Sequence, residues 1–359
     1  MSWTVIAAKD LSECQGDAWI EILRGNPALA SPFFRPEYTR CVAKELPIEV
    51  AIFSRDGQPI SFFPFERVNE SIAIAPGRSL ADYQGIIRFA DDPLDMRAML
   101  SQANISRWEF DHLLIMDGQL NPWCWTNWES PQIDLKQGTD HYFADLFSRH
   151  ANLKGLRKSE RRICRDIGEL RFEFGCRDQS VLELLLKWKA AQYEATQRLH
   201  PFTNAWVSIL FKEMLTYQQA DFRGLLTVLW AGCEPLAIEY SLQSHQTLHT
   251  LVSAYNIEYS KYSPGMLRDL HLIEECGKHG ITCIDMGKGL ESYKKKLMNA
   301  ACKLGEGSVD SFQARGYVRH LLNESRYRFL RSPWSLPAKR VARSAARIVP
   351  SIRRILSMR

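Results

Sequence analysis

The stretch that decides the fold is residues 247–278, TLHTLVSAYNIEYSKYSPGMLRDLHLIEECGK. Its first part, 247–254, is mostly apolar and β-forming, which predicts a strand. Its last part, 266–278, repeats apolar residues at helical spacing, which predicts an α-helix. A Ser-Pro-Gly turn at 263–265 joins them, so we expect the chain to pass from a strand through a tight loop into a helix.

The start of this helix is a candidate phosphate site. The first backbone N–H groups of a helix lack partners and carry partial positive charge, which suits an anion. Pro264 presets φ for the first turn, Gly265 allows a ligand close to the backbone, and Ser263 could cap the helix. The residues expected to bind the phosphate are Lys261, Tyr262, Ser263, Gly265 and Met266.

The flanking segments predict an α/β unit around a mostly antiparallel sheet. Apolar β-forming runs alternate with stretches of helical periodicity on both sides of the deciding stretch. The strands are expected at 170–174, 225–230, 236–242, 247–254, 281–286 and 307–312, and the helices at 141–168, 180–198, 205–219, 266–278 and 292–298.

The first half shows a shorter version of the same order. An Asp56-Gly57 turn between apolar runs predicts a β-hairpin. Three tryptophans between 120 and 131 either line a ligand surface or close the core between the halves. We therefore predict an α/β protein with two tandem units, each with a mixed, mostly antiparallel central sheet flanked by helices. The expected boundaries are 1–140, 141–314 and a basic C-terminal tail, 315–359.

Composition favours a folded protein of a reducing compartment. The 359 residues are 45% hydrophobic and 24% charged, which is typical of globular chains. The 9 cysteines form no C-x-x-C pair, which argues against a secreted disulfide framework and a structural zinc site. No apolar run reaches the length of a membrane span, and the N terminus does not resemble a signal peptide. We expect a cytoplasmic protein without a metal.

The net charge of +5 is concentrated at the C terminus. Residues 315–359 hold 12 Lys and Arg but one acidic residue, so the rest of the chain is net acidic. This distribution argues against a DNA-binding body. Residues 338–359 space apolar side chains at helical intervals among arginines. That pattern fits either a helix lying on the inner membrane surface or a disordered basic tail.

Several motifs resemble the CelD-like family of GNAT acyltransferases, which is associated with cellulose and exopolysaccharide biosynthesis. The resemblance covers residues 30–312 and is most specific between Tyr262 and Lys294. It implies two tandem GNAT-like (acyl-CoA N-acyltransferase) domains, the first degenerate. It also implies an acyl-CoA donor, acetyl-CoA above all, whose pyrophosphate binds before the helix 266–278. The motifs are PFF at 32–34, DYQG at 82–85, the basic residues of 154–165, YSPGML at 262–267, HLIE at 271–274, IDMGKG at 284–289 and Tyr293-Lys294.

Direct acyl transfer needs a proton acceptor, and three residues are candidates for catalysis. Glu239 lies on the polar face of the strand 236–242. There it either acts as a base or is a structural carboxylate with a charged partner. His249 on the next strand either relays a proton or only packs. Asp285 ends a strand where ligands of α/β sheets bind, or else caps the following helix. With the resemblance, the expected acceptor-binding residues are Asp82, Tyr83, Lys288, Tyr293 and Lys294.

We therefore expect an acyltransferase that moves an acyl group from acyl-CoA to an amine or hydroxyl of a small molecule or glycan. Two alternatives stay open. A Fem-type aminoacyltransferase would hold aminoacyl-tRNA with the basic residues of 154–165, although these could also bind a nucleotide-sugar or lipid headgroup, or only face solvent. A non-catalytic polysaccharide-assembly protein would use both halves to bind a partner.

Overall fold

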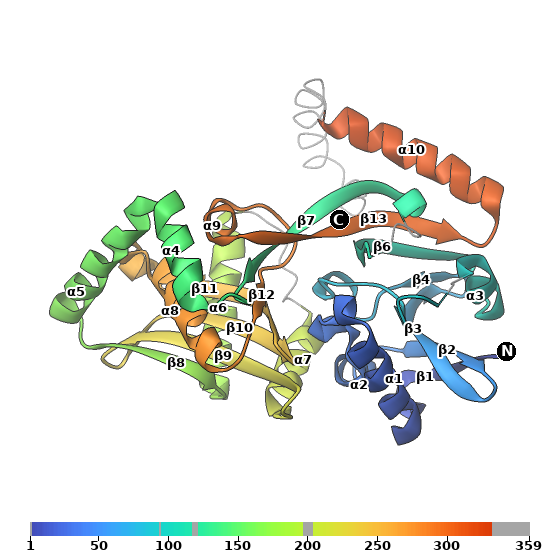
Figure 1. The fold of residues 1–359 in the computed structure, drawn as a ribbon, viewed down its shortest axis with the longest axis horizontal. Helices are drawn as coiled ribbons and strands as arrows, with labels where there is room; N and C mark the ends of the chain where they lie inside the picture. The colour runs from blue at the N-terminus through green and yellow to red at the C-terminus, as the bar shows by residue number, and fades with distance from the viewer. Residues whose placement is uncertain (1, 93–94, 117–120, 197–203, 332–359) are drawn as a thin grey trace.

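A computed structural model describes residues 2–92, 95–116, 121–196 and 204–331. Within them, a 13-stranded mixed sheet runs through the whole molecule (Figure 1). The strand order is β1-β2-β3-β4-β6-β13-β7-β12-β11-β10-β9-β8, and β5 pairs with β3 outside this path. The predicted α/β class with two sheet-and-helix units is confirmed, and the two sheets are continuous with each other.

The first half supplies one end of the sheet. The predicted hairpin forms at Asp56 and Gly57, whose φ angles of 51° and 83° are both positive, as a two-residue turn between twisted strands requires. The strands are β1 (Ser2–Ala7), β2 (Ile48–Arg55), β3 (Gln58–Asn69), β4 (Ile72–Ile74), β5 (Ile87–Arg88) and β6 (Arg107–Leu114). The helices are α1 (Glu13–Gly25), α2 (Pro36–Ala43) and α3 (Met96–Gln102).

The second half supplies the other end. The single helix predicted for 141–168 is wrong, because the chain leaves helical geometry at His150 (φ −136°) and passes through a 3-10 turn at 151–155. The strands are β8 (Leu170–Cys176), β9 (Phe222–Ala231), β10 (Glu234–Ser244), β11 (Thr247–Tyr255) and β12 (Cys283–Asp285). The helices are α4 (Thr139–Arg149), α5 (Leu156–Asp166), α6 (Gln179–Thr196), α7 (Ala205–Thr216), α8 (Pro264–Lys278) and α9 (Ser292–Leu297).

Two long strands join the halves at the centre of the sheet. The segment with the tryptophans forms β7 (Cys124–Asp134), which pairs with β12 and with β13 (Ala300–Asp310). β13 also pairs with β6, so a strand from near the end of the chain lies between two strands of the first 140 residues. Figure 1 shows β7 and β13 side by side across the middle of the molecule.

One apolar core continues across the junction of the halves. Trp19 and Tyr38 of the first half belong to the same buried cluster as Phe211 and Tyr240 of the second. The buried Arg35 adds an ion pair from the first half to Asp221 in the second, at 3.1 Å. Buried contacts of this kind hold the two halves in a fixed relation, which matters because the candidate site lies between them.

After β13 the chain forms α10 (Gln313–Arg331), which packs on β7 and β13. The expected basic helix or tail at 338–359 lies outside the described residues. Within the described part, no helix combines the length and apolar content that a bilayer-crossing segment needs.

Candidate active site

The two central strands of the second half separate at the candidate site. β11 and β12 are parallel neighbours only from Thr247/Cys283 to His249/Asp285. β11 then continues to Tyr255. The segment that follows β12 turns away through Gly287 and Gly289, whose φ angles are 71° and 113°. Functional groups of α/β sheets gather where parallel strands end. The last pair before the strands separate, His249 and Asp285, were both predicted as catalytic residues.

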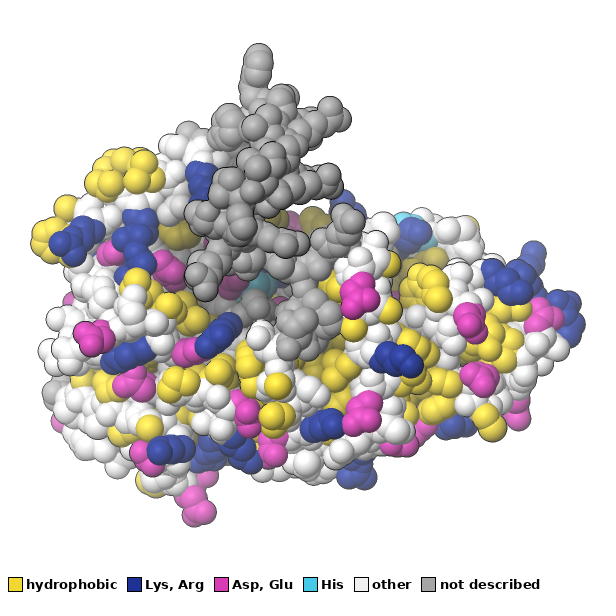
Figure 2. Space-filling model, turned by 180° about the vertical axis from the view of Figure 1, so that it is seen from behind, with side chains coloured by type: hydrophobic (Ala, Val, Ile, Leu, Met, Phe, Trp, Pro, Cys, Tyr) yellow, Lys and Arg dark blue, Asp and Glu magenta, His cyan; other side chains and the backbone are white. Residues whose placement is uncertain are grey.

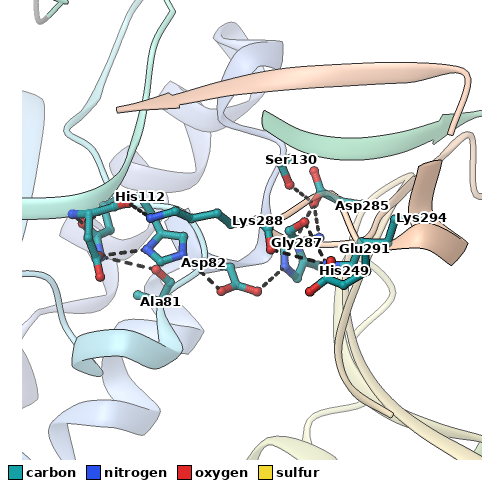
Figure 3. A network of polar contacts seen from close by, with 12 residues as sticks. Ala81, Asp82, His112, Ser130, His249, Asp285, Gly287, Lys288, Glu291 and Lys294 are labelled. Atoms are coloured by element: carbon teal, nitrogen blue, oxygen red, sulfur yellow. Dashed lines mark hydrogen bonds and ion pairs between the residues drawn. The ribbon is translucent and has the colours of Figure 1, made fainter. Parts of the chain in front are cut away.

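The imidazole of His249 is fully buried between two carboxylates (Figure 3). Its Nε2 lies 3.0 Å from Asp82 Oδ2, and its Nδ1 lies 3.4 Å from Asp285 Oδ1. The second contact is not aligned as a hydrogen bond, so Nδ1 has no hydrogen-bond partner among the described residues. Burial alone would lower the pKa of His249, but the charges of Asp285 and Asp82 outweigh it and raise this pKa.

Asp285 is held in place by donors from β7 and from two loops, the one that contains Tyr83 and the one that follows β12. Its carboxylate accepts hydrogen bonds from the Tyr83 hydroxyl, from Ser130 Oγ at 2.8 Å and from Gln132 Nε2 at 2.7 Å. The backbone N–H of Gly287 donates a further bond at 2.9 Å. These donors orient the carboxylate beside His249 and compensate its burial. Tyr83 and Asp285, which were predicted to bind the acceptor and to act in catalysis, are thus in direct contact, and both roles stay predictions.

Asp82 is the partly exposed member of the group. Burial would raise its pKa, but His249 and His112 lower it below its ordinary value. Its second oxygen, Oδ1, lies 3.7 Å from His112 Nε2, and His112 Nδ1 lies 2.8 Å from Asp111 Oδ1. Carboxylates and imidazoles thus alternate in a row from the half-buried Asp111 to the buried Asp285.

The loop after β12 lies against this row and is held there by its own Lys288 and by Lys294 of α9. Lys288 Nζ donates to the backbone oxygen of Asp111 at 2.7 Å and lies 4.9 Å from the Trp128 ring centre. Lys294 is buried and donates to the backbone oxygen of Gly287 at 3.2 Å. Burial lowers the pKa of Lys288. Lys288 therefore ties the second half to the first, and its predicted contact with an acceptor stays a prediction, as does that of Lys294.

Glu239 has a different environment from the one that His249 occupies. It is buried, and its carboxylate lies 2.9 Å from the guanidinium of Arg268 on α8, beside Asp269. Burial raises the pKa of Glu239, although the Arg268 charge opposes the shift. The ion pair supports the alternative that Glu239 is a structural carboxylate, while its role as a base stays a prediction. Tyr293, predicted to bind the acceptor, is half-buried near this pair.

The predicted phosphate site lies at the start of α8. The expectation that Ser263 caps the helix is wrong. Its backbone is left-handed (φ 56°, ψ 50°), and its side chain does not reach the helix N–H groups as an extended cap residue would. The side chain of Tyr262 is buried and donates to Asp166 Oδ2 at 2.9 Å. A Cβ added at Gly265 would lie 3.6 Å from Tyr255, so the backbone here is open on one side.

Two more of the residues predicted at this turn differ in exposure. Lys261 is exposed, and its amine lies 4.9 Å from the Tyr262 ring centre. Met266 is half-buried against the core beneath α8. The main chain of the turn and the Lys261 amine are thus the groups available to an anion, and phosphate binding there stays a prediction.

Comparison with known proteins agrees with this arrangement. Residues 150–295 match the family model described as an acetyltransferase (GNAT) domain. The crystal structure of FemX covers 90% of this chain and 100% of its own, at 10% sequence identity and a TM-score of 0.57. A tandem GNAT protein from the clavulanic acid biosynthesis pathway covers 87% of this chain and 99% of its own, at 8% identity and a TM-score of 0.50.

The chain has a tandem GNAT fold. At identities this low, similarity to the solved structures extends to the fold alone. No protein of curated function matches the sequence.

The tandem GNAT fold brings together residues that the sequence analysis missed. His112 and Asp111 on β6 extend the row beyond Asp82, while Ser130 and Gln132 on β7 hold Asp285. The adjacent Asp111 and His112, directly before the apolar Leu113 and Leu114, were the available signal for β6. In the part of the chain that the structure describes, no three His, Cys, Asp or Glu side chains are grouped to hold a metal ion.

Proposed function

We propose that this tandem GNAT protein is an acyltransferase that moves an acyl group, acetyl above all, from acyl-CoA directly to an amine or hydroxyl. The observation that carries the proposal is the buried His249, paired with Asp82 and flanked by Asp285 where β11 and β12 separate. The GNAT match over residues 150–295 supports the acyl-CoA donor. The finer assignment, a sugar acceptor in exopolysaccharide or envelope synthesis, rests on the CelD-like motifs.

The geometry suggests a route for the proton. The acceptor nitrogen or oxygen attacks the thioester carbonyl, a new bond to the acyl carbon forms, and the carbon–sulfur bond breaks to release the CoA thiolate. Asp82 is the member of the pair that reaches solvent, so it binds the acceptor N–H or O–H. The proton then passes through the Asp82 carboxylate to Nε2 of neutral His249, because the pKa of His249 is raised while that of Asp82 is lowered.

Asp285 and the row beyond Asp82 complete the proposed mechanism. Asp285 stabilises the charged form of the imidazole, since four donors keep its carboxylate in place 3.4 Å from His249 Nδ1. The contacts from Asp82 through His112 to Asp111 offer a path by which the proton leaves to solvent. The thioester carrier binds with its diphosphate at the first N–H groups of α8, with Lys261 beside it.

The donor assignment is tested by thermal unfolding and mass spectrometry with a series of acyl-CoAs. A cognate ester at about 100 times its Kd should stabilise the protein by about 2.7 kcal/mol. Gly265→Glu should abolish that gain without harming the fold, because a carboxylate at a helix start is itself favourable. Gly265→Ala is the matched control, since the space around this position accepts a methyl group.

The opposite results would favour another function. If no CoA ester stabilises the protein, the acyl-CoA proposal fails and a non-catalytic binding role becomes the better explanation. If a CoA ester stabilises the wild type and Gly265→Glu equally, the donor site lies elsewhere.

The basic helix α5 favours one second candidate, Fem-type aminoacyl transfer. Its arginine and lysine side chains are exposed together on one short helix, as RNA phosphates would require. Salt-sensitive binding of aminoacyl-tRNA, lost in Arg157→Glu/Arg161→Glu, would support this candidate. The exposed basic residues in and before α5 are Lys154, Arg157, Lys158, Arg161, Arg162 and Arg165.

A further inference from the structure

The helix α10 presents an apolar face to solvent. Tyr317, Val318, Leu321 and Leu322 lie within two turns of each other and are 65%, 56%, 43% and 67% exposed. In Figure 2 yellow side chains protrude at the upper left, where the turned view places α10. An amphipathic helix of a soluble protein normally buries this face, so the arrangement is inverted.

Polar contacts on the opposite side of α10 fix this orientation. Arg319 Nε donates to Asp310 Oδ2 at 3.4 Å, and the Tyr327 hydroxyl donates to Glu306; both acceptors lie on β13. Gly316 is buried, and a Cβ at this position would lie 3.3 Å from Asp310. Since the polar face is anchored to the sheet, the apolar face cannot turn inward without breaking these contacts.

The charged side chains that α10 exposes beside its apolar face are positive. Between positions 314 and 326, α10 exposes Arg315 and Arg326, while its one acidic residue there, Glu324, is half-buried. The chain that follows, 332–359, has seven Lys and Arg and no Asp or Glu in its sequence. An apolar stripe bordered by arginines is complementary to a surface with anionic groups above an apolar layer.

We propose that the apolar face of α10 docks on an anionic lipid surface, with Arg315 and Arg326 at the level of the lipid phosphates. A second copy of the chain fits this face less well, because two such faces would bring their arginines and basic C termini together. Residues 332–359 would also be repelled from this face, because they are basic and Arg315 and Arg326 border the face with positive charge. The proposal does not depend on the acyltransferase assignment.

The test uses the full-length chain and two kinds of vesicle, phosphatidylcholine alone and phosphatidylcholine mixed with phosphatidylglycerol. We expect sedimentation with the anionic vesicles and weaker binding as salt is raised. Val318→Glu/Leu322→Glu should lower the partition coefficient at least about tenfold, because two apolar side chains no longer enter the lipid. Ile209→Glu, which changes an exposed apolar residue on α7, is the control and should bind like the wild type.

Three results would overturn the proposal. The first is wild-type protein that binds both vesicles equally or neither. The second is a double variant, shown to be folded by circular dichroism, that keeps wild-type binding, since the basic C terminus alone would then explain the attraction. The third is a wild-type dimer in analytical ultracentrifugation that the double variant dissociates, because the face would then be a contact between copies.

Discussion

His249 Nε2 lies 3.0 Å from Asp82 Oδ2, although the two residues are 167 positions apart. Asp82 follows β4 of the first half, while His249 belongs to β11 of the second. Neither half alone contains this pair, so the proposed proton acceptor exists only in the joined structure.

His249→Gln should slow acyl transfer by at least about 100-fold, because the amide cannot take the acceptor's proton. Stabilisation by the acyl-CoA donor should persist, since the α8 turn is unchanged. Steady-state rates and thermal shifts measured on the same preparation separate the two effects. His245→Gln is a suitable control, because His245 lies beside Asp221 and Arg35 instead of in the row. A variant with wild-type turnover would remove His249 from the mechanism.

Asp82→Asn should move the rise of kcat/KM to lower pH. His249 accepts a proton only when neutral, so the rate rises as pH passes upward through its pKa. The Asp82 charge raises that pKa, and its removal lowers it. Asp111→Asn should shift the profile less, because Asp111 contacts His112 and not His249. An unchanged midpoint in Asp82→Asn, or a shift to higher pH, would contradict the pairing.

Gly287→Ala should reduce activity strongly, because a Cβ there would lie 2.8 Å from Asp82 Oδ2 and displace it from His249. Part of any loss in stability comes from the left-handed backbone, at about 1 kcal/mol. Gly280→Ala is the control. It has the same cost in stability from a left-handed backbone, with φ 68°, but no atom lies within 4 Å of the added carbon. Equal losses of activity in both variants would show that backbone strain, not displacement of Asp82, is responsible.

Glu239→Gln should lower the free energy of unfolding by about 1–3 kcal/mol, because Arg268 loses one of its two buried carboxylate partners. Turnover per folded molecule should stay the same across pH if Glu239 is structural. Urea unfolding and a pH–rate profile distinguish the two roles. A stable variant that has lost its activity would instead make Glu239 the base.

Much of the second half was predictable because its signals are local. The strand 236–242 and the helix 266–278 fall within β10 and α8, since alternation and helical spacing reflect the face that each buries. β7 was missed because CWTNWESPQID does not alternate and contains Pro131, while its partners, β12 and β13, lie far along the chain. Its strand character comes from the sheet around it.

The candidate site likewise contains residues that the sequence indicated and residues whose role depends on distant strands. Asp82, His249 and Asp285 were named from sequence, through the motifs and through polar residues on apolar strands, and they lie in contact. Ser130 and Gln132 gave no such signal, because their role depends on β7 lying next to β12. A hydroxyl or amide in a strand is ordinary until the neighbouring strand is known.

The position of β13 sets the order in which the molecule can be completed during synthesis. β6 and β7 are made early, but the strand between them is residues 300–310, which leave the ribosome only after every other strand of the sheet. A nascent chain that stops short of residue 300 has His249 and Asp82 but lacks the strand that bridges β6 and β7. Completion of the central sheet is therefore a late event, and a premature stop before β13 should yield an incompletely folded chain that proteases degrade.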